Sequence, residues 1–276
     1  MSAKGRPECE YRSAQREGTP MTTPGRLDGL GILITRPARQ AAGLARQIAA
    51  IGGSPVMFPA IVILPPQDRK PLDQAQRELA RYDLAVFVSA NAVEYGVGDP
   101  AAWPKRLLVL APGPGTAAAL AAAGIDNVRL PATTMDSEGL LALPELAAVS
   151  GKRVVIFRGG GGRELLGVTL QRRGAMVDTV DCYRRARPES GAAGLEDALR
   201  AGRVDAVTLT SSEGLDNLWA LLGSDARARL AATPTFVPHP RIAARAGEHG
   251  IARVIVTPPA DAGLLAALLE YFATTH

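Results

Sequence analysis

The glycine-rich segment at residues 154–170, VVIFRGGGGRELLGVTL, contains the residue types best suited to anion binding. An apolar run rich in β-branched residues ends at Arg158, and Gly159–Gly162 lead through Arg163 into an amphipathic helical pattern. A strand that passes through glycines into a helix start presents backbone N–H groups and a helix N-terminus to solvent. Two arginines bracket the turn, so the segment predicts a site for an anion.

Known phosphate and dinucleotide motifs do not fit this segment. The Lys-Ser/Thr pair of a P-loop is absent, and the GxGxxG spacing is not met. No acidic residue ends a strand about 20 residues later, because Asp178 and Asp181 lie inside an extended run. A glycine-rich turn with solvated arginines is the alternative to an anion site.

Several hydroxyl residues are further candidates, each with a structural alternative. Thr116 follows Pro-Gly-Pro-Gly, and Ser89 and Ser211 each follow a predicted strand, so helix capping is the alternative role for all three. Tyr183 follows an alternating run, where a tyrosine commonly packs with its hydroxyl satisfied. The histidines and cysteines show no metal-ligand spacing, and no GxSxG elbow is present. We therefore expect no cofactor and no metal.

Composition excludes some classes of protein. The chain has 276 residues, of which 47% are hydrophobic and 21% charged, as in a globular protein of one large or two small domains. No apolar run reaches the ~18 residues of a membrane span. The two cysteines lie far apart in the sequence, which favours a reducing compartment and a cytoplasmic location.

The first 26 residues are predicted to form a disordered tail. They lack hydrophobic periodicity and the apolar core of a signal peptide. They also carry five basic and three acidic side chains, which is half of the net charge of +4. The rest of the chain is nearly balanced and shows no basic stripe, so we expect no nucleic-acid partner.

The elements that position the candidate residues are predicted to come from an internal duplication. Four segments of the first half recur in order in the second half, about 120 residues later. The matched pairs are GILITRPARQ (31–40) with VVIFRGGGGR (154–163), YDLAVFVSANAV (82–93) with VDAVTLTSSEGL (204–215), GPGTAAALAAAGI (113–125) with HPRIAARAGEHGI (239–251), and SEGLLAL (137–143) with DAGLLAA (261–267). Their shared order indicates two copies of one unit.

Each copy alternates strands with helices, which predicts βαβ units and parallel, doubly wound sheets. The predicted strands are 32–35, 56–63, 84–88, 107–110 and 127–130 in the first copy, and 153–157, 176–183, 205–210, 235–238 and 253–256 in the second. Ser137 and Asp261 are predicted to cap the last helix of each copy. Ligands of such sheets bind at the carboxyl ends of the strands, which is where the candidate residues lie.

Eight segments follow one another along residues 29–273 in a specific order: ILITRP, VFVSANAVE, the GxxTAxxL segment around Gly113, FRGGGGRELL, DTVDCYRR, TSSEGLDNL, HPRIA and LLAALLEY. With these segments in this order, the chain resembles the uroporphyrinogen-III synthase family. The resemblance implies two similar flavodoxin-like α/β domains joined by a two-stranded ladder. One would comprise 27–62 and 183–276, and the other 63–182. The extended runs 56–64 and 175–185 are longer than a mean strand and suit such crossings.

The resemblance also implies an activity in heme and tetrapyrrole biosynthesis. The linear tetrapyrrole hydroxymethylbilane would be cyclised to uroporphyrinogen III in an interdomain cleft, with loss of water and inversion of the terminal pyrrole through a spiro intermediate. Tyr183 matches the tyrosine implied as the acid. The substrate is a polycarboxylate, so the anion of the glycine turn would be a carboxylate. The implied substrate-binding residues are Arg36, Ser89, Gly113, Thr116, Arg158, Gly160, Arg163, Ser211 and Arg241.

One departure from the family pattern concerns His239-Pro240-Arg241. Where relatives are expected to carry hydroxyl residues, this segment has none. We therefore expect Arg241 to replace a hydroxyl contact with a charged one.

Two other classes of function stay open on the sequence alone. A two-lobed polyanion-binding protein without catalysis would resemble periplasmic binding proteins, which the missing signal peptide disfavours. A pair of receiver-like domains would need an acidic pocket, whereas the strand ends here carry Ser, Thr, Gly and Arg. We expect a monomeric enzyme that acts on a small molecule, with no membrane or nucleic-acid partner.

Overall fold

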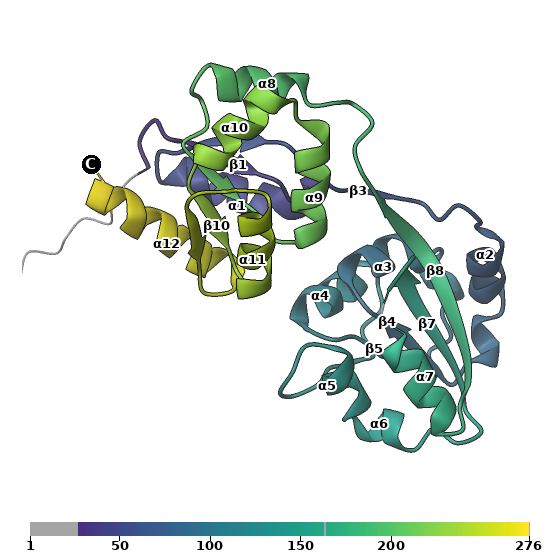
Figure 1. The fold of residues 1–276 in the computed structure, drawn as a ribbon. Coiled ribbons are helices and arrows are strands. Elements are labelled where there is room, and N and C mark those ends of the chain that lie inside the picture. Colours follow the sequence, from purple (N-terminus) through teal and green to yellow (C-terminus); the bar gives the residue numbers. More distant parts are fainter. Residues whose placement is uncertain (1–26, 163, 276) are drawn as a thin grey trace, which may run out of the picture.

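The computed structural model describes residues 27–162 and 164–275. Figure 1 shows two α/β bodies connected by the long strand β8 (Met176–Ala186) and by the segment that carries β3 (Val62–Leu64). The predicted disordered tail, residues 1–26, lies outside the described residues, as does Arg163.

The first sheet consists of five parallel strands in the described chain, in the order β11-β10-β9-β1-β2. Their bounds are β1 Gly31–Ile34, β2 Ser54–Met57, β9 Ala206–Thr208, β10 Thr235–Val237 and β11 Val254–Val256. Relabelled by connection, the order is 2-1-3-4-5, which is the flavodoxin-like arrangement.

Helices cover both faces of the first sheet. They are α1 Ala38–Ala50, α8 Ala193–Arg200, α9 Ser212–Leu221, α10 Ser224–Ala232, α11 Pro240–Glu248 and α12 Ala260–Thr275. Neighbouring side chains of β1 point to opposite faces: Ile32 packs with α1 and α12, and Leu33 packs with α8 to α11. Burial on both faces explains the continuous apolar runs of these strands.

The second sheet has six strands in the described chain, in the order β3-β8-β7-β4-β5-β6. The remaining strands are β4 Leu84–Phe87, β5 Leu108–Leu110, β6 Val128–Arg129 and β7 Arg153–Gly159. The helices are α2 Lys70–Arg77, α3 Ala90–Gly96, α4 Pro114–Ala122, α5 Ser137–Leu141, α6 Pro144–Ala147 and α7 Leu165–Arg172, with short 3₁₀ turns at Leu79–Arg81 and Pro100–Ala102. All pairings are parallel except that of β3 with β8.

The predicted duplication is confirmed, and the two copies exchange strands. Apart from β3, each sheet takes two strands from one copy and three from the other. In the first sheet, Leu33 pairs with Val207. In the second sheet, their repeat counterparts Val155 and Ala85 pair with each other in the same way. The same register in both sheets shows that the exchange is reciprocal.

Equivalent hydrogen bonds join the exchanged strands. Asp205 Oδ2 accepts the N–H of Gly31 at 2.7 Å, and Asp83 Oδ2 accepts the N–H of Arg153 at 2.9 Å. Each aspartate precedes a strand of one copy and binds the first residue of a strand from the other copy. The two contacts therefore fix strand register in both sheets.

The antiparallel ladder between β3 and β8 lies at the centre of this exchange. Its three pairs are Val62–Ala186, Ile63–Arg185 and Leu64–Arg184. Ile63 and Arg185 are themselves repeat counterparts, and the two outer pairs exchange under the repeat. The approximate two-fold axis that relates the two copies therefore passes through the Ile63–Arg185 pair.

The two long extended runs of the sequence behave differently. Met176–Ala186 forms one strand of 11 residues, whereas 56–64 is divided between β2 and β3, so its prediction as one strand is wrong. Pro59 has no N–H to continue a ladder. The N–H of Phe58 still donates to Ile34, but that of Ala60 turns to the carbonyl of Thr35.

Helix caps confirm some predictions and correct others. Ser89 and Ser211 cap α3 and α9 through their hydroxyl oxygens. The cap of α5 is Asp136, one residue before the predicted Ser137. Asp261 lies inside α12, and Gly113 rather than Thr116 is the cap of α4. Aspartate and serine are nearly equal as caps, so their adjacency made the α5 boundary ambiguous.

The exact domain boundaries at 62 and 183 stay a prediction, because they fall within the β3–β8 crossing. Among the described residues, none of the helices is both long and apolar enough to cross a membrane.

Candidate functional site

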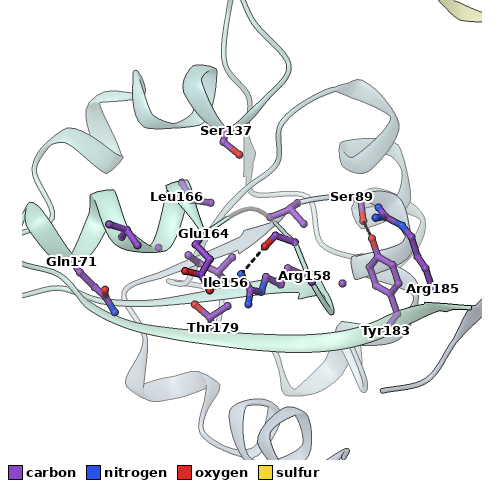
Figure 2. A pocket seen from close by; sticks show the side chains of 16 residues that line it. Ser89, Ser137, Ile156, Arg158, Glu164, Leu166, Gln171, Thr179, Tyr183 and Arg185 are labelled. Carbon is purple, nitrogen blue, oxygen red and sulfur yellow. Dashed lines mark hydrogen bonds between the residues drawn. The ribbon is translucent and has the colours of Figure 1, made fainter. Parts of the chain in front are cut away.

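A cavity of about 540 Å³ lies at the carboxyl ends of β4 and β7 in the second sheet. From these neighbouring strands the chain continues to β8 on one side and to β5 on the other. Such a switch point is where open α/β sheets bind ligands. Figure 2 shows the lining side chains, including Ser89, Arg158, Tyr183 and Arg185.

Tyr183 and Ser89 form a hydroxyl pair in this cavity. The Oη of Tyr183 lies 3.2 Å from the Oγ of Ser89 (Figure 2). The same Oγ accepts the N–H of Ala92 at 3.1 Å, because Ser89 caps α3. A hydroxyl has two lone pairs and one proton, so Ser89 can still accept from Tyr183 or donate to its anion. The pair can therefore release and recover one proton.

Packing holds the Tyr183 ring in one place. Only 2% of Tyr183 is exposed, and its ring centroid lies 6.3 Å from that of Tyr95. On another side the ring faces the backbone of Gly159. A Cβ added at Gly159 would lie 2.5 Å from Cζ of Tyr183. Glycine at this position therefore makes room for the tyrosine.

The other glycines of the turn mainly serve the turn itself. The N–H of Gly160 donates to the carbonyl of Tyr183 at 2.8 Å, and that of Gly162 donates to Gly159 at 3.2 Å. Gly161 has a φ of 74°, which favours glycine. Gly160 was predicted to donate its N–H to an anion, but that N–H is already bonded within the protein. The predicted Arg163 lies outside the described residues.

Arg158 is oriented by two contacts at the edge of the cavity. Its Nε donates to Oδ1 of Asp181 at 2.9 Å, and its Nη1 donates to the carbonyl of Gly162 at 3.3 Å. The guanidinium has five N–H donors, so others remain for a carboxylate. Arg158 thus fits the predicted anion site, with Asp181 as its support.

Cys182 precedes Tyr183 in β8, but its thiol serves packing rather than proton transfer. Its Sγ donates to the carbonyl of Arg158 at 3.0 Å, and burial raises the pKa of the thiol to about 12. The thiol therefore stays protonated near neutral pH and acts as a packing group.

The equivalent place in the first sheet carries different residues. Arg36 and Ser211 follow β1 and β9, and their counterparts Arg158 and Ser89 lie at the end of β7 and after β4. There Arg36 forms an ion pair with Asp261, and the counterpart of Tyr183 is Ile61. Because isoleucine has no hydroxyl, the described residues at that place offer no equivalent proton donor.

The predicted site residues fall into separate groups. Ser89, Arg158 and Tyr183 line the cavity. Gly113 and the buried Thr116 lie in the same domain, at the start of α4, outside the cavity lining. The residues with the first sheet are Arg36, Ser211 and Arg241, of which Arg241 is exposed in the first turn of α11.

Sequence reasoning missed several cavity residues. They are Ser137, Glu164, Gln171, Thr179 and Arg185. Thr179 and Arg185 lie in the same strand as Tyr183, and the alternation of a strand was a signal that could have identified them. Within residues 27–162 and 164–275, no cluster of three or more His, Cys, Asp or Glu could hold a metal.

Comparisons with known proteins agree with this geometry. The family model for uroporphyrinogen-III synthase HemD matches residues 42–266. The uroporphyrinogen-III synthase of Salmonella typhimurium is 36% identical over 198 residues, which is 70% of this chain and 80% of that protein. The Synechococcus elongatus enzyme of the same name is 32% identical over 205 residues, covering 72% and 77%.

Solved structures share the fold. A mutant uroporphyrinogen III synthase from Thermus thermophilus superposes with a TM-score of 0.56, at 19% identity, covering 89% of this chain and 99% of that one. The Helicobacter pylori uroporphyrinogen-III synthetase gives 0.54 at 13% identity, covering 90% and 99%. The duplicated two-domain α/β fold and the match over most of the sequence show that this chain belongs to the uroporphyrinogen-III synthase family.

Proposed function

We propose that this chain cyclises hydroxymethylbilane to uroporphyrinogen III, with loss of water and inversion of the terminal pyrrole ring. The observation that carries the proposal is the Tyr183–Ser89 hydroxyl pair, 3.2 Å apart, in a cavity at the sheet's switch point. Arg158 at the same cavity offers charge-assisted hydrogen bonds to a carboxylate of the substrate.

Tyr183 is the proposed proton donor. Its O–H protonates the hydroxymethyl oxygen, the C–O bond breaks, and water leaves with that proton. The electron pair of the adjacent pyrrole nitrogen forms the azafulvenium cation, while Ser89 donates a hydrogen bond to the tyrosinate. The substituted carbon of the terminal pyrrole bonds to the electrophilic methylene to give the spiro intermediate, and the bond from that carbon to its former methylene bridge breaks. That former bridge then bonds to the free α-carbon of the same ring, whose proton returns to Tyr183. Electrons and protons balance, so the reaction needs no oxidant or reductant.

The protein's second task is to direct the ring closure. The azafulvenium cation is reactive on its own, so the enzyme must hold the terminal ring with its substituted carbon facing the reactive carbon. Binding of this kind fixes the relative orientation of the reacting carbons before the reaction, which lowers the entropic part of the activation barrier. Arg158, held by Asp181, is the proposed anchor for one carboxylate on this side of the cavity.

We further propose that the domains comprise 27–62 with 183–276 and 63–182, and that the protein acts as a cytoplasmic monomer without a cofactor. The reciprocal strand exchange supports this division, since each sheet then lies in one domain apart from residues 62 and 183–186 of the β3–β8 crossing. The substrate is a small molecule, and the near balance of charge outside residues 1–26 supports the absence of a nucleic-acid partner.

The product isomer tests the proposed activity. The purified chain is incubated with hydroxymethylbilane, and the products are oxidised to uroporphyrins and separated. Spontaneous closure yields the type I isomer, so an excess of type III is the expected result. Type I alone, at the rate without protein, would contradict the activity and favour a polyanion-binding protein.

Arg241→Ala tests the charged contact that we propose between Arg241, at the start of α11 beside the first sheet, and the substrate. Arg241 is exposed, and its N–H already donates to Nδ1 of His239 at 3.0 Å, so its side chain can be removed without affecting that cap. We expect KM for hydroxymethylbilane to rise several-fold, by about 1 kcal/mol of lost binding, with a smaller effect on kcat. An unchanged KM in steady-state assays would exclude this contact.

A further inference from the structure

Arg185 occupies a singular place in the molecule. It pairs with Ile63 at the centre of the β3–β8 ladder, where the approximate two-fold axis passes. Its repeat counterpart is therefore Ile63, an apolar residue. The duplication thus places the guanidinium of Arg185 at the centre of the ladder, with no charged counterpart in the other copy.

The side chain of Arg185 reaches both domains. It lines the cavity of the second sheet, and Figure 2 shows its guanidinium extending towards Ser89 and Tyr183. Its Nη1 also lies 3.8 Å from Oε2 of Glu213, in the first turn of α9. Ser211, which caps that helix, is the counterpart of Ser89. Arg185 therefore lies between the strand end that carries Ser89 in the second sheet and the strand end that carries Ser211 in the first.

The contact with Glu213 is loose. The side chains of Arg185 and Glu213 are 49% and 48% exposed, and 3.8 Å is beyond a hydrogen bond. Exposed pairs of this kind contribute little to stability. A carboxylate bound in the cavity can therefore displace Glu213 at low cost and form a closer, bidentate contact with the guanidinium.

We propose that Arg185 binds a carboxylate of the pyrrole ring held beside Tyr183, and that Glu213 competes for its guanidinium in the empty enzyme. This inference rests on the proposed function, because it names a binding group for the same substrate. Arg185 is thus a specificity residue for a polycarboxylate, and Glu213 links the other domain to that binding step.

Three variants separate this role from a general effect of charge. Arg185→Ala is expected to raise KM for hydroxymethylbilane about ten-fold or more, because a charge-assisted contact is lost, while Arg185→Lys restores part of it. Arg184→Ala is the matched control. It removes a neighbouring arginine from the same strand, and successive strand residues point to opposite faces. We expect its KM to stay within two-fold of the unmodified chain.

Glu213→Gln tests the competition directly. Removing the competing carboxylate is expected to lower KM about two-fold, and to have no effect when Arg185→Ala is already present. An Arg185→Ala variant with unchanged KM would overturn the proposal. So would a Glu213→Gln effect of equal size with and without Arg185. Circular dichroism and Tm confirm that each variant is folded.

A binding measurement keeps this test independent of catalysis. Uroporphyrin III, the oxidised and unreactive form of the product, is titrated into the same variants and followed by its fluorescence. We expect Arg185→Ala to raise its Kd about ten-fold and Arg184→Ala to leave it within two-fold. Absence of type III product together with this binding pattern would contradict the activity but leave the role of Arg185 in place. Type III production with equal Kd values would support the activity and contradict the role of Arg185.

Discussion

Replacement of Tyr183 by phenylalanine is expected to lower kcat for type III formation about 100-fold or more, with little change in KM. The variant removes the one hydroxyl that pairs with Ser89 in the cavity and leaves the ring in its packing site. Without that proton donor, the hydroxymethyl group must leave without acid assistance. The measurement is the steady-state rate of type III formation, with products separated by isomer.

Tyr95→Phe is the matched control for this variant. Tyr95 contacts the ring of Tyr183, and its hydroxyl donates to the carbonyl of Ile63 at 3.0 Å, outside the Tyr183–Ser89 pair. It is expected to lose about 1 kcal/mol of stability and only a few-fold in kcat. If Tyr183→Phe also loses only a few-fold, positioning rather than acid catalysis accounts for the rate.

Gly159→Ala is expected to have the second largest effect. The new Cβ would lie 2.5 Å from Cζ and 2.9 Å from Oη of Tyr183, so the ring must move away from Ser89. Overpacking of this kind costs about 1–3 kcal/mol of folding free energy. Since the displaced atom is the proposed acid, kcat should fall at least ten-fold, a loss measured at a temperature well below the lowered Tm.

Gly160→Ala provides the comparison within the same turn. Among the described residues, a Cβ at Gly160 meets no atom closer than 3.7 Å, and the substitution keeps the N–H that donates to Tyr183. Its effect on Tm and kcat should be far smaller than that of Gly159→Ala. Equal losses in both variants would show that the turn is sensitive as a whole and that the Tyr183 ring is not the cause.

Sequence patterns predicted those features that depend on local order. The duplication and the alternation of strands and helices followed from periodicity and self-similarity. Strand ends rich in Ser, Thr, Gly and Arg then indicated the edge of the sheets where a ligand binds. Ser89 and Arg158 could be placed at the same edge for that reason, and the structure brings them to one cavity.

Features that depend on contacts between distant residues could not be predicted. The sequence indicated that Gly159 is one of the residues whose backbone N–H groups face an anion. In the structure, glycine is required there because the ring of Tyr183, in the neighbouring strand, leaves no room for a Cβ atom. Arg185 acquires its position from pairing with Ile63 in the other copy. The ion pair of Arg36 with Asp261 likewise joins residues at opposite ends of the chain.

We place the reaction in the cavity of the second sheet, beside Tyr183. A crystal structure of the chain with uroporphyrinogen III bound would show where the product lies. We expect the product to occupy the space lined by Ser89, Arg158 and Tyr183, with a carboxylate in contact with Arg158. Product bound beside Arg36 and Ser211 at the edge of the first sheet, with this cavity empty, would rule out the cavity of the second sheet as the place of the reaction.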